Sequence, residues 1–173
     1  SIDTRTAKAG QVFFAISGPN FDGHQFMDES IAKDCVGLVV NNEFISRAVA
    51  ASGEAPDRVF VVAVENTVKA LGMIANAWIH VLGPKVVAVT GSVGKTTTKE
   101  LLAACMKTRY VTLATVGNLN NHIGLPLTAL SLKPEHEAVV FEMGMNHAGE
   151  IAHLCKIARP QIGVVTYVGP VHL

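Results

Sequence analysis

A short run that combines glycines, a lysine and threonines is the part of this chain best suited to chemistry. Gly91-Ser92-Val93-Gly94 is followed at once by Lys95-Thr96-Thr97. Glycines let a backbone approach an anion closely, and the free N–H groups and dipole of a helix start favour negative charge. Lys95 is suited to reach the outer phosphates of a nucleotide, and the Thr96 hydroxyl to ligate Mg²⁺. We therefore predict that the phosphates are bound by Gly91, Ser92, Val93, Gly94, Lys95, Thr96 and Thr97.

The spacing of this loop departs from the common phosphate-binding pattern. That pattern has four residues between its two glycines, whereas here only Ser92 and Val93 lie between them, and Val89 stands where the first glycine is expected. A plain strand-to-helix turn with a surface lysine is the competing interpretation. The strand-like run before the loop and the helical pattern after it favour phosphate binding.

The elements around the loop follow from periodicity. Val86-Val87-Ala88-Val89 is apolar and β-branched, which is typical of a buried strand. The helix expected from Lys95 onward places Leu101, Leu102 and Cys105 on one apolar face. Further strands are expected at residues 110–115, 138–141 and 162–167, with helices starting near Pro126 and Gly149.

Polar residues follow the expected strand ends, where open α/β sheets bind ligands. Glu142 comes directly after the strand at 138–141 and is suited to hold Mg²⁺, although a solvated strand end is the alternative. Asn118 and Asn121 are suited to bind phosphate oxygens, but asparagine is also common in turns. His172 is a weaker candidate, because imidazole is a poor ligand for Mg²⁺. His122 and His147 are interpreted as structural.

The first half of the chain predicts a smaller α/β unit. Strands are expected at residues 12–16, 36–40 and 59–64, short helices at 26–34 and 41–49, a loop at 17–20 and a turn at 54–57. Asn66 is expected to cap a helix from Thr67 to Val81, which Gly83-Pro84 ends. The fold class is therefore α/β, with a small N-terminal α/β domain over residues 1–83. A mostly parallel α/β domain of the P-loop type, truncated at residue 173, follows from residue 84.

Composition limits the partners of the protein. Of its 173 residues, 49% are hydrophobic, and 14 acidic residues balance 14 lysines and arginines. No basic surface for nucleic acid is therefore expected. We expect no membrane span, because no apolar run is long enough, and no secretion signal, because no basic region is followed by an apolar stretch at the start. Cys35, Cys105 and Cys155 all lie in apolar contexts and are expected to be buried free thiols in a reducing, cytoplasmic compartment.

Several motifs resemble those of the Mur ligases, the ATP-dependent enzymes of peptidoglycan precursor assembly. Residues 90–97 resemble their shortened phosphate loop, and residues 3–5, 10–15 and 21–24 resemble their N-terminal nucleotide-sugar domain. Residues 117–126 and 142–151 are most similar to the branch of the family that adds D-alanyl-D-alanine. The resemblance covers nearly the whole chain.

The resemblance implies a ligase that joins D-Ala-D-Ala to UDP-N-acetylmuramoyl-tripeptide through an acyl phosphate, with ATP and Mg²⁺. It implies that Thr96 and Glu142 bind Mg²⁺, that His172 helps to hold a second Mg²⁺, and that Asn118 and Asn121 line the cleft. The catalytic residues would be Lys95, Glu142 and His172. The UDP part would be bound by Thr4, Arg5, Asp22 and His24, although Arg5 is as readily a surface arginine. A monomer is expected.

Two departures and three alternatives accompany this resemblance. His122 stands where the family usually has Asp. The family's carbamylated lysine and C-terminal domain would follow residue 173, so residues 1–173 alone are not expected to complete the reaction. A Mur-type ligase that adds the third peptide residue is one alternative, and folylpolyglutamate synthase, which lacks the first domain, is another. A nucleotide-binding module without activity of its own is the third.

Overall fold

The computed structural model describes residues 1–18, 21–53 and 59–169. Contacts between residues divide the chain into two compact units, Ser1–Ala70 and Leu71–Leu173. Each unit is considered by itself below. Within the described ranges, no helix has the length and apolar character needed to cross a membrane.

The first unit is built on a parallel sheet of three strands in the order β1-β4-β5. Between β1 and β4 in the sequence, β2 and β3 form a short antiparallel pair. Residues 17–18 are therefore in a strand and not in the expected loop. The elements are η1 (Thr4–Thr6), β1 (Val12–Phe14), β2 (Ser17–Gly18), β3 (Phe21–Asp22), η2 (Gly23–Phe26), α1 (Met27–Ala32), β4 (Gly37–Asn41), η3 (Asn42–Phe44), α2 (Ile45–Ser52) and β5 (Phe60–Val64). The turn expected at residues 54–57 lies outside the described residues.

The core of the first unit comes from alternation along its strands. Leu38 and Val40 of β4 pack with Phe13 of β1 and with Met27 and Ala48 of the helices α1 and α2. In a strand, alternate side chains share one face, so the helices cover that face of the sheet.

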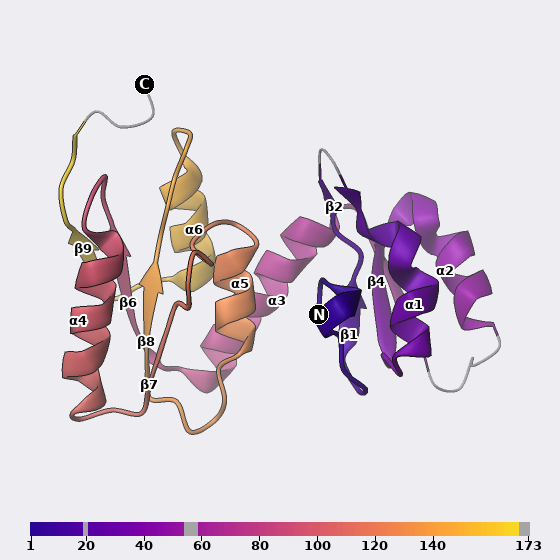
Figure 1. The fold of residues 1–173 in the computed structure, drawn as a ribbon, viewed down its shortest axis with the longest axis horizontal. Helices are drawn as coiled ribbons and strands as arrows, with labels where there is room; N and C mark the ends of the chain where they lie inside the picture. The colour runs from indigo at the N-terminus through magenta and orange to yellow at the C-terminus, as the bar shows by residue number, and fades with distance from the viewer. Residues whose placement is uncertain (19–20, 54–58, 170–173) are drawn as a thin grey trace. The chain divides into compact units, whose positions relative to one another are not determined.

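The second unit holds a parallel sheet of four strands in the order β7-β8-β6-β9 (Figure 1). Its elements are β6 (Lys85–Thr90), α4 (Lys95–Lys107), β7 (Thr112–Ala114), α5 (Gly124–Leu130), β8 (Ala138–Glu142), α6 (Glu150–Ala158) and β9 (Ile162–Val165). The helix α3 (Thr67–Leu82) begins in the first unit and continues into the second. Parallel strands alternating with helices confirm the predicted fold class.

Both faces of β6 are covered, as its unbroken apolar run predicts. Val86 and Ala88 pack into a core shared with α3, α5 and α6, whereas Val87 and Val89 face Ala103 of α4. The sheet is therefore a middle layer, with α4 on one side and three helices on the other.

The strand order places a topological switch point at β6. The connection through α4 leads from β6 to β7 at one edge, and the connection through α6 leads from β8 across β6 to β9 at the other. Open α/β sheets bind ligands outside the carboxyl ends of their strands at such a point. The loop after β6 lies there.

The helix α3 matches its expected cap and end. Asn66 Oδ1 accepts a hydrogen bond from the N–H of Lys69 (2.9 Å), and Gly83 beyond the helix has a φ of +61°. From the middle of the helix onward, Ala75 and Ile79 pack in the core of the second unit. The division into two units by contacts falls within α3, between Ala70 and Leu71. The domain boundary near residue 83 stays a prediction.

The apolar face expected for α4 is right for Leu102 but wrong for Leu101 and Cys105. Leu101 is 63% exposed and Cys105 is exposed as well. The side chains turned inward are those of Lys99, Leu102, Ala103 and Met106, which follow the i, i+3, i+4, i+7 spacing of one helix face. Apolar periodicity counts only apolar residues, so it does not place a lysine on the inward face.

The three cysteines are free, but only Cys35 is buried. Cys155 is half-buried and Cys105 is exposed on α4, so the expectation of three buried thiols is wrong for Cys105. The cause is the same rotation of α4 that exposes Leu101.

Paired substitutions test the orientation of α4. We expect Leu101→Ala to change the free energy of unfolding by less than about 0.5 kcal/mol, as for exposed positions in general. Leu125→Ala, at a fully buried position of α5, should cost about 2–5 kcal/mol because it leaves a cavity. Urea unfolding of both variants is the measurement, and equal losses would contradict the orientation described here.

Candidate functional site

The loop between β6 and α4 has a backbone that only glycine accommodates readily. Gly91 has a φ of +135° and Gly94, which caps α4, has a φ of +84°. A Cβ atom on Gly91 would collide with Thr166 Oγ1 and lie 2.9 Å from the carbonyl oxygen of Tyr167. Gly91 is therefore required by both its conformation and its close packing, and Gly94 by its conformation.

Every carbonyl of this loop already has a partner. Lys95 Nζ donates to the oxygens of Gly91 (2.7 Å) and Ser92 (3.3 Å), and Thr166 Oγ1 donates to that of Val93 (2.6 Å). The oxygen of Gly94 accepts from the N–H of Thr98 inside the helix.

The N–H groups of the same loop are left without acceptors. Among the described residues, those of Val93, Gly94, Lys95 and Thr96 bond to no other group. With its carbonyls engaged and its N–H groups free at the start of a 13-residue helix, the loop favours an anion. Thr96 and Thr97 are exposed in the first turn of that helix.

The segment after β9 is tied to this loop. The N–H of Ser92 donates to the carbonyl of Tyr167 (2.7 Å), and Ser92 Oγ donates to the carbonyl of Gly169 (2.9 Å). The N–H of Gly169 in turn donates to Ser92 Oγ (3.1 Å). The Ser92 side chain therefore holds the loop in place. No pattern in the sequence indicates that Thr166 and Gly169 contact this loop.

Glu142 lies at the end of β8 and is buried, with only 3% of its surface exposed. Its Oε1 accepts a hydrogen bond from Asn120 Nδ2 (2.8 Å), while its Oε2 is buried with no hydrogen-bond partner. A buried carboxylate oxygen without a donor is unfavourable, and a cation bound there would remove the deficit. The structure therefore fits a metal ligand better than the alternative of a solvated strand end.

The three asparagines after β7 have different surroundings. Asn121 Oδ1 accepts from the N–H groups of Ile123 (3.0 Å) and Gly124 (2.8 Å), a local turn at the start of α5. Asn118 is exposed. Asn120, which the sequence argument passed over, is the asparagine that contacts Glu142.

Two cavities adjoin the loop, and Lys95 lines both. One, of about 190 Å³, lies between the loop and β9 and is lined by Thr90, Gly91, Ser92, Lys95, Met145, Asn146, Ile151, Val165 and Val168. The other, of about 230 Å³, is more polar and is lined by Lys95, Asn120, Asn121, His122, Gly144, Met145, Asn146 and Glu150. Lys95, Asn121 and His122 are thus brought together, whereas His172 lies outside the described residues.

Glu150 shapes the wall of the polar cavity. Its Oε2 accepts from the N–H groups of Asn146 (2.7 Å) and His147 (3.2 Å), and these bonds hold the pKa of the carboxyl below its usual value. The carboxylate is therefore a local cap for the loop that follows β8, in line with its position in the first turn of α6.

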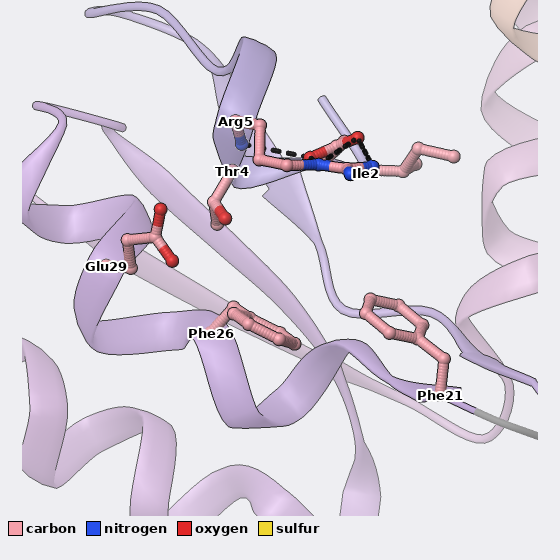
Figure 2. A pocket seen from close by; sticks show the side chains of 7 residues that line it. Ile2, Thr4, Arg5, Phe21, Phe26 and Glu29 are labelled. Carbon is pink, nitrogen blue, oxygen red and sulfur yellow. Dashed lines mark hydrogen bonds and ion pairs between the residues drawn. The ribbon is translucent and has the colours of Figure 1, made fainter.

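The first unit has a cavity of its own, of about 480 Å³ (Figure 2). Its lining consists of Ile2, Asp3, Thr4, Arg5, Phe21, Phe26 and Glu29. The rings of Phe21 and Phe26 stack with their centroids 5.4 Å apart and give the cavity an apolar, flat side. Lys33 Nζ donates to the carbonyl of Thr4 (2.7 Å) and so fixes the opposite side. The sequence argument did not identify the two phenylalanines.

Arg5 is already paired in this structure. Its guanidinium lies 2.7 Å from Asp3 Oδ2, and hydrogen bonds from its side chain and backbone N–H lower the pKa of Asp3 to about 2. The Arg5 side chain is 86% exposed, and such a surface pair is weak. The pair therefore commits Arg5 only weakly to Asp3.

Asp22 and His24 hold the unit together internally. Asp22 Oδ1 accepts from Ser17 Oγ (2.7 Å) and from His24 Nδ1 (2.7 Å), while His24 Nε2 accepts from the N–H of Asn41 (3.0 Å). The last bond requires the tautomer with its proton on Nδ1. Since His24 is fully buried and both ring nitrogens are engaged, it joins the β2–β3 pair to β4 and does not line the cavity.

The environment of Asp22 also sets its ionisation. Burial alone would raise the pKa of its carboxyl, but the hydrogen bonds from Ser17 and His24 outweigh the effect of burial and lower the pKa.

Among the described residues, no three side chains of His, Cys, Asp or Glu type come together as a metal cluster.

Comparisons with known proteins agree with this geometry. The Mur ligase middle domain matches residues 89–173, and the catalytic domain of the Mur ligase family matches residues 1–79. The chain belongs to the Mur ligase family. It is 39% identical over 171 residues to the UDP-N-acetylmuramoyl-tripeptide–D-alanyl-D-alanine ligase of Bacillus subtilis. That match covers 99% of this chain but only 36% of the relative, so the chain spans about a third of its length.

Solved structures of Mur ligases have the same fold. The corresponding D-alanyl-D-alanyl ligase of Acinetobacter baumannii superposes with a TM-score of 0.85 at 35% identity, over 99% of this chain and 36% of that one. A MurF ligase from Thermotoga maritima in complex with ADP gives a TM-score of 0.84 at 36% identity, over 100% of this chain and 38% of that one.

A glycine substitution tests the loop as an anion site. We expect Gly91→Ala to raise the dissociation constant for ADP at least about 10-fold, since a residue forced into a disfavoured φ costs roughly 1–3 kcal/mol. Gly163→Ala, in β9 with no atom within 4 Å of the added carbon, is the matched control and should leave ADP binding unchanged. Calorimetric titration of both variants is the measurement, and equal affinities would exclude the loop.

Proposed function

We propose that this chain supplies the substrate-binding and nucleotide-binding parts of a ligase that joins D-Ala-D-Ala to UDP-N-acetylmuramoyl-tripeptide at the expense of ATP. The observation that carries the proposal is the buried, unpartnered Glu142 Oε2 at the sheet edge that also bears the anion-binding loop. The similarity to ligases of this name supports the choice of substrates.

The second unit would bind ATP through its loop. The free N–H groups of Val93, Gly94, Lys95 and Thr96 face the phosphates, and Lys95 exchanges the carbonyls of Gly91 and Ser92 for phosphate oxygens. Phosphoryl transfer depends mostly on positioning and on charge stabilisation, which these groups provide. The γ-phosphoryl group passes to the terminal carboxylate of the tripeptide. The amine of D-Ala-D-Ala then displaces phosphate and forms the amide.

Mg²⁺ fits the side chains at this edge. Glu142 Oε2 would ligate it together with the Thr96 hydroxyl, and phosphate oxygens and water would complete the oxygen ligands that the ion prefers. The ion supplies neutralisation of phosphate charge, so that a carboxylate anion can approach. A role for His172 at a second Mg²⁺ and for Asn118 and Asn121 at the phosphates stays part of the proposal.

The first unit would bind the UDP part of the sugar nucleotide. The stacked rings of Phe21 and Phe26 offer a flat apolar surface for the base, while Thr4 and Arg5 lie on the polar side of the same cavity. Asp22 and His24 would contribute through the shape of the β2–β3 pair. Within this proposal the protein acts as a cytoplasmic monomer.

Substrate dependence tests the function directly. In the protein that carries this chain, we expect ATP to be converted to ADP and free phosphate only when UDP-N-acetylmuramoyl-tripeptide and D-Ala-D-Ala are both present. Phosphate release with UDP-N-acetylmuramoyl-dipeptide and a diamino acid would instead identify the ligase that adds the third residue. Nucleotide binding without turnover of either substrate pair would identify a binding module that has no activity of its own.

Lys95 is the residue whose loss should matter most to turnover. We expect Lys95→Ala to lower turnover by about two orders of magnitude or more, as for loss of one preorganised charge in other enzymes. The exposed Lys107→Ala in the last turn of the same helix is the control. Steady-state phosphate release measures both, and near-normal turnover of Lys95→Ala would exclude the assigned role.

Glu142→Gln separates a metal ligand from a structural carboxylate. The variant keeps the shape of the side chain but lacks its charge, so we expect a large fall in turnover that raised Mg²⁺ or Mn²⁺ partly restores. The melting temperature without nucleotide should not fall, because Glu142 has no cationic side chain as a hydrogen-bond partner to be left unpaired.

The exposed Glu135→Gln is the control for this substitution. Activity measured against Mg²⁺ concentration and melting without ligand are the two readouts. Unchanged activity, or a clear drop in melting temperature, would remove Glu142 from the metal site.

A further inference from the structure

A lysine is buried beside the candidate metal site. Lys99 lies one helical turn after Lys95 on α4, and only 1% of its surface is exposed. Among the described residues, Lys99 and Glu142 are the only lysine, arginine, aspartate or glutamate side chains that are buried. The chemistry proposed above uses Glu142 but gives Lys99 no role.

Lys99 has one hydrogen-bond partner in the interior and one at the surface. Its Nζ donates to the carbonyl oxygen of Thr115 (2.7 Å) and to Glu100 Oε1 (2.6 Å). The Glu100 side chain is 65% exposed, so water and ions screen the attraction between its carboxylate and the ammonium group of Lys99. The interior partner of the ammonium group is therefore the main chain of Thr115.

Thr115 in turn holds Glu142. Its Oγ1 accepts a hydrogen bond from the N–H of Glu142 (3.0 Å), and its own N–H donates to the carbonyl of Val140 (3.0 Å). Thr115 is itself buried, with 2% of its surface exposed. A continuous set of hydrogen bonds thus runs from α4 through the residue after β7 to the end of β8.

The energetics show that this arrangement needs a compensating gain. Taking an ammonium group out of water costs several kcal/mol, and a leucine or methionine at this inward position would avoid that cost. The neighbouring inward residues of α4, Leu102, Ala103 and Met106, are all apolar. What Lys99 provides that they do not is a donor aimed at the carbonyl of Thr115.

We propose that Lys99 is a positioning residue that fixes Thr115 and, through it, the main chain of Glu142, so that Oε2 is held ready for the metal of the bound nucleotide. The inference rests on the proposed function only for the identity of the ligand. Because Lys95 and Lys99 lie four residues apart on one helix, the same rigid element sets both the phosphate loop and the carboxylate.

Lys99→Met tests this, because methionine keeps the length and helix preference of the side chain and removes its donors. In the protein that carries this chain, we expect Mn²⁺ to bind the ADP complex about 10-fold more weakly, as with other indirect partners of metal ligands. ADP binding without metal should be unchanged. Turnover at saturating Mg²⁺ should stay near that of the unaltered protein, so that the Mg²⁺ requirement rises while kcat does not.

The readouts are Mn²⁺ titration followed by electron paramagnetic resonance and amide hydrogen exchange of the segment 138–145. We expect the amide of Glu142 to exchange faster in Lys99→Met, with no ligand present. Lys107→Met removes an exposed lysine from the same helix and is the matched control, for which neither readout should change. Thr115→Val removes the acceptor for the Glu142 amide and should reproduce both effects, while the double variant should add nothing further.

The outcomes distinguish this proposal from the proposed function. If Lys99→Met leaves Mn²⁺ affinity and the exchange of Glu142 unchanged, the positioning role is overturned. If Lys99→Met does not fold, unchanged values in Thr115→Val overturn it equally, because the proposed path passes through Thr115. If the unaltered protein binds no ADP with Mn²⁺, the proposed function fails, and faster exchange of Glu142 in Lys99→Met still supports the positioning role.

Discussion

The proposed nucleotide site depends on the hydrogen bonds that the four carbonyl groups of the loop after β6 accept. Lys95 Nζ donates hydrogen bonds to the carbonyl oxygens of Gly91 and Ser92, and Thr166 Oγ1 donates one to that of Val93. Because each carbonyl has a partner inside the protein, the loop presents N–H groups to the ligand, and the dipole of α4 reinforces them. A short loop with only two residues between its glycines can therefore serve as an anion site, since its shape is imposed by contacts from β9 and α4.

The parallel sheet explains why these contacts meet. The connection from β6 leads to β7 on one side, and the connection from β8 crosses β6 to β9 on the other. The ends of β8 and β9 therefore flank the loop although they are distant in sequence. The end of β8 brings Glu142, and the segment after β9 brings Thr166 and the main chain of Gly169. The positions of a carboxylate, a hydroxyl and an N–H cluster are thus fixed by strand pairing, which is rigid compared with a surface loop.

Much of this was predictable from the sequence, and the failures have physical causes. The loop and Glu142 stand out because glycine, lysine and a carboxylate at strand ends have few structural explanations. Asn120 was missed because three asparagines share one loop, and the backbone turn alone decides which one faces Glu142. Lys99 is not predicted because apolar periodicity ignores a lysine. The periodicity instead adds Leu101 and Cys105 to Leu102 on the inward face. His24 was assigned to the ligand because its sequence motif does not reveal that both nitrogens are engaged internally.

Each unit uses a lysine to hold a main-chain carbonyl beside its candidate site. Lys33 donates to Thr4 at the wall of the first cavity, and Lys99 donates to Thr115 behind Glu142. A lysine suits this task because its long stem packs along apolar side chains while its ammonium group makes a charge-assisted bond to a neutral acceptor. In the second unit, the bond to Thr115 leaves Glu142 without a cationic hydrogen-bond partner. In the second unit Glu142 Oε2 therefore keeps its unmet need for a cation, and that deficit, set by the fold, is the free energy that metal binding would recover.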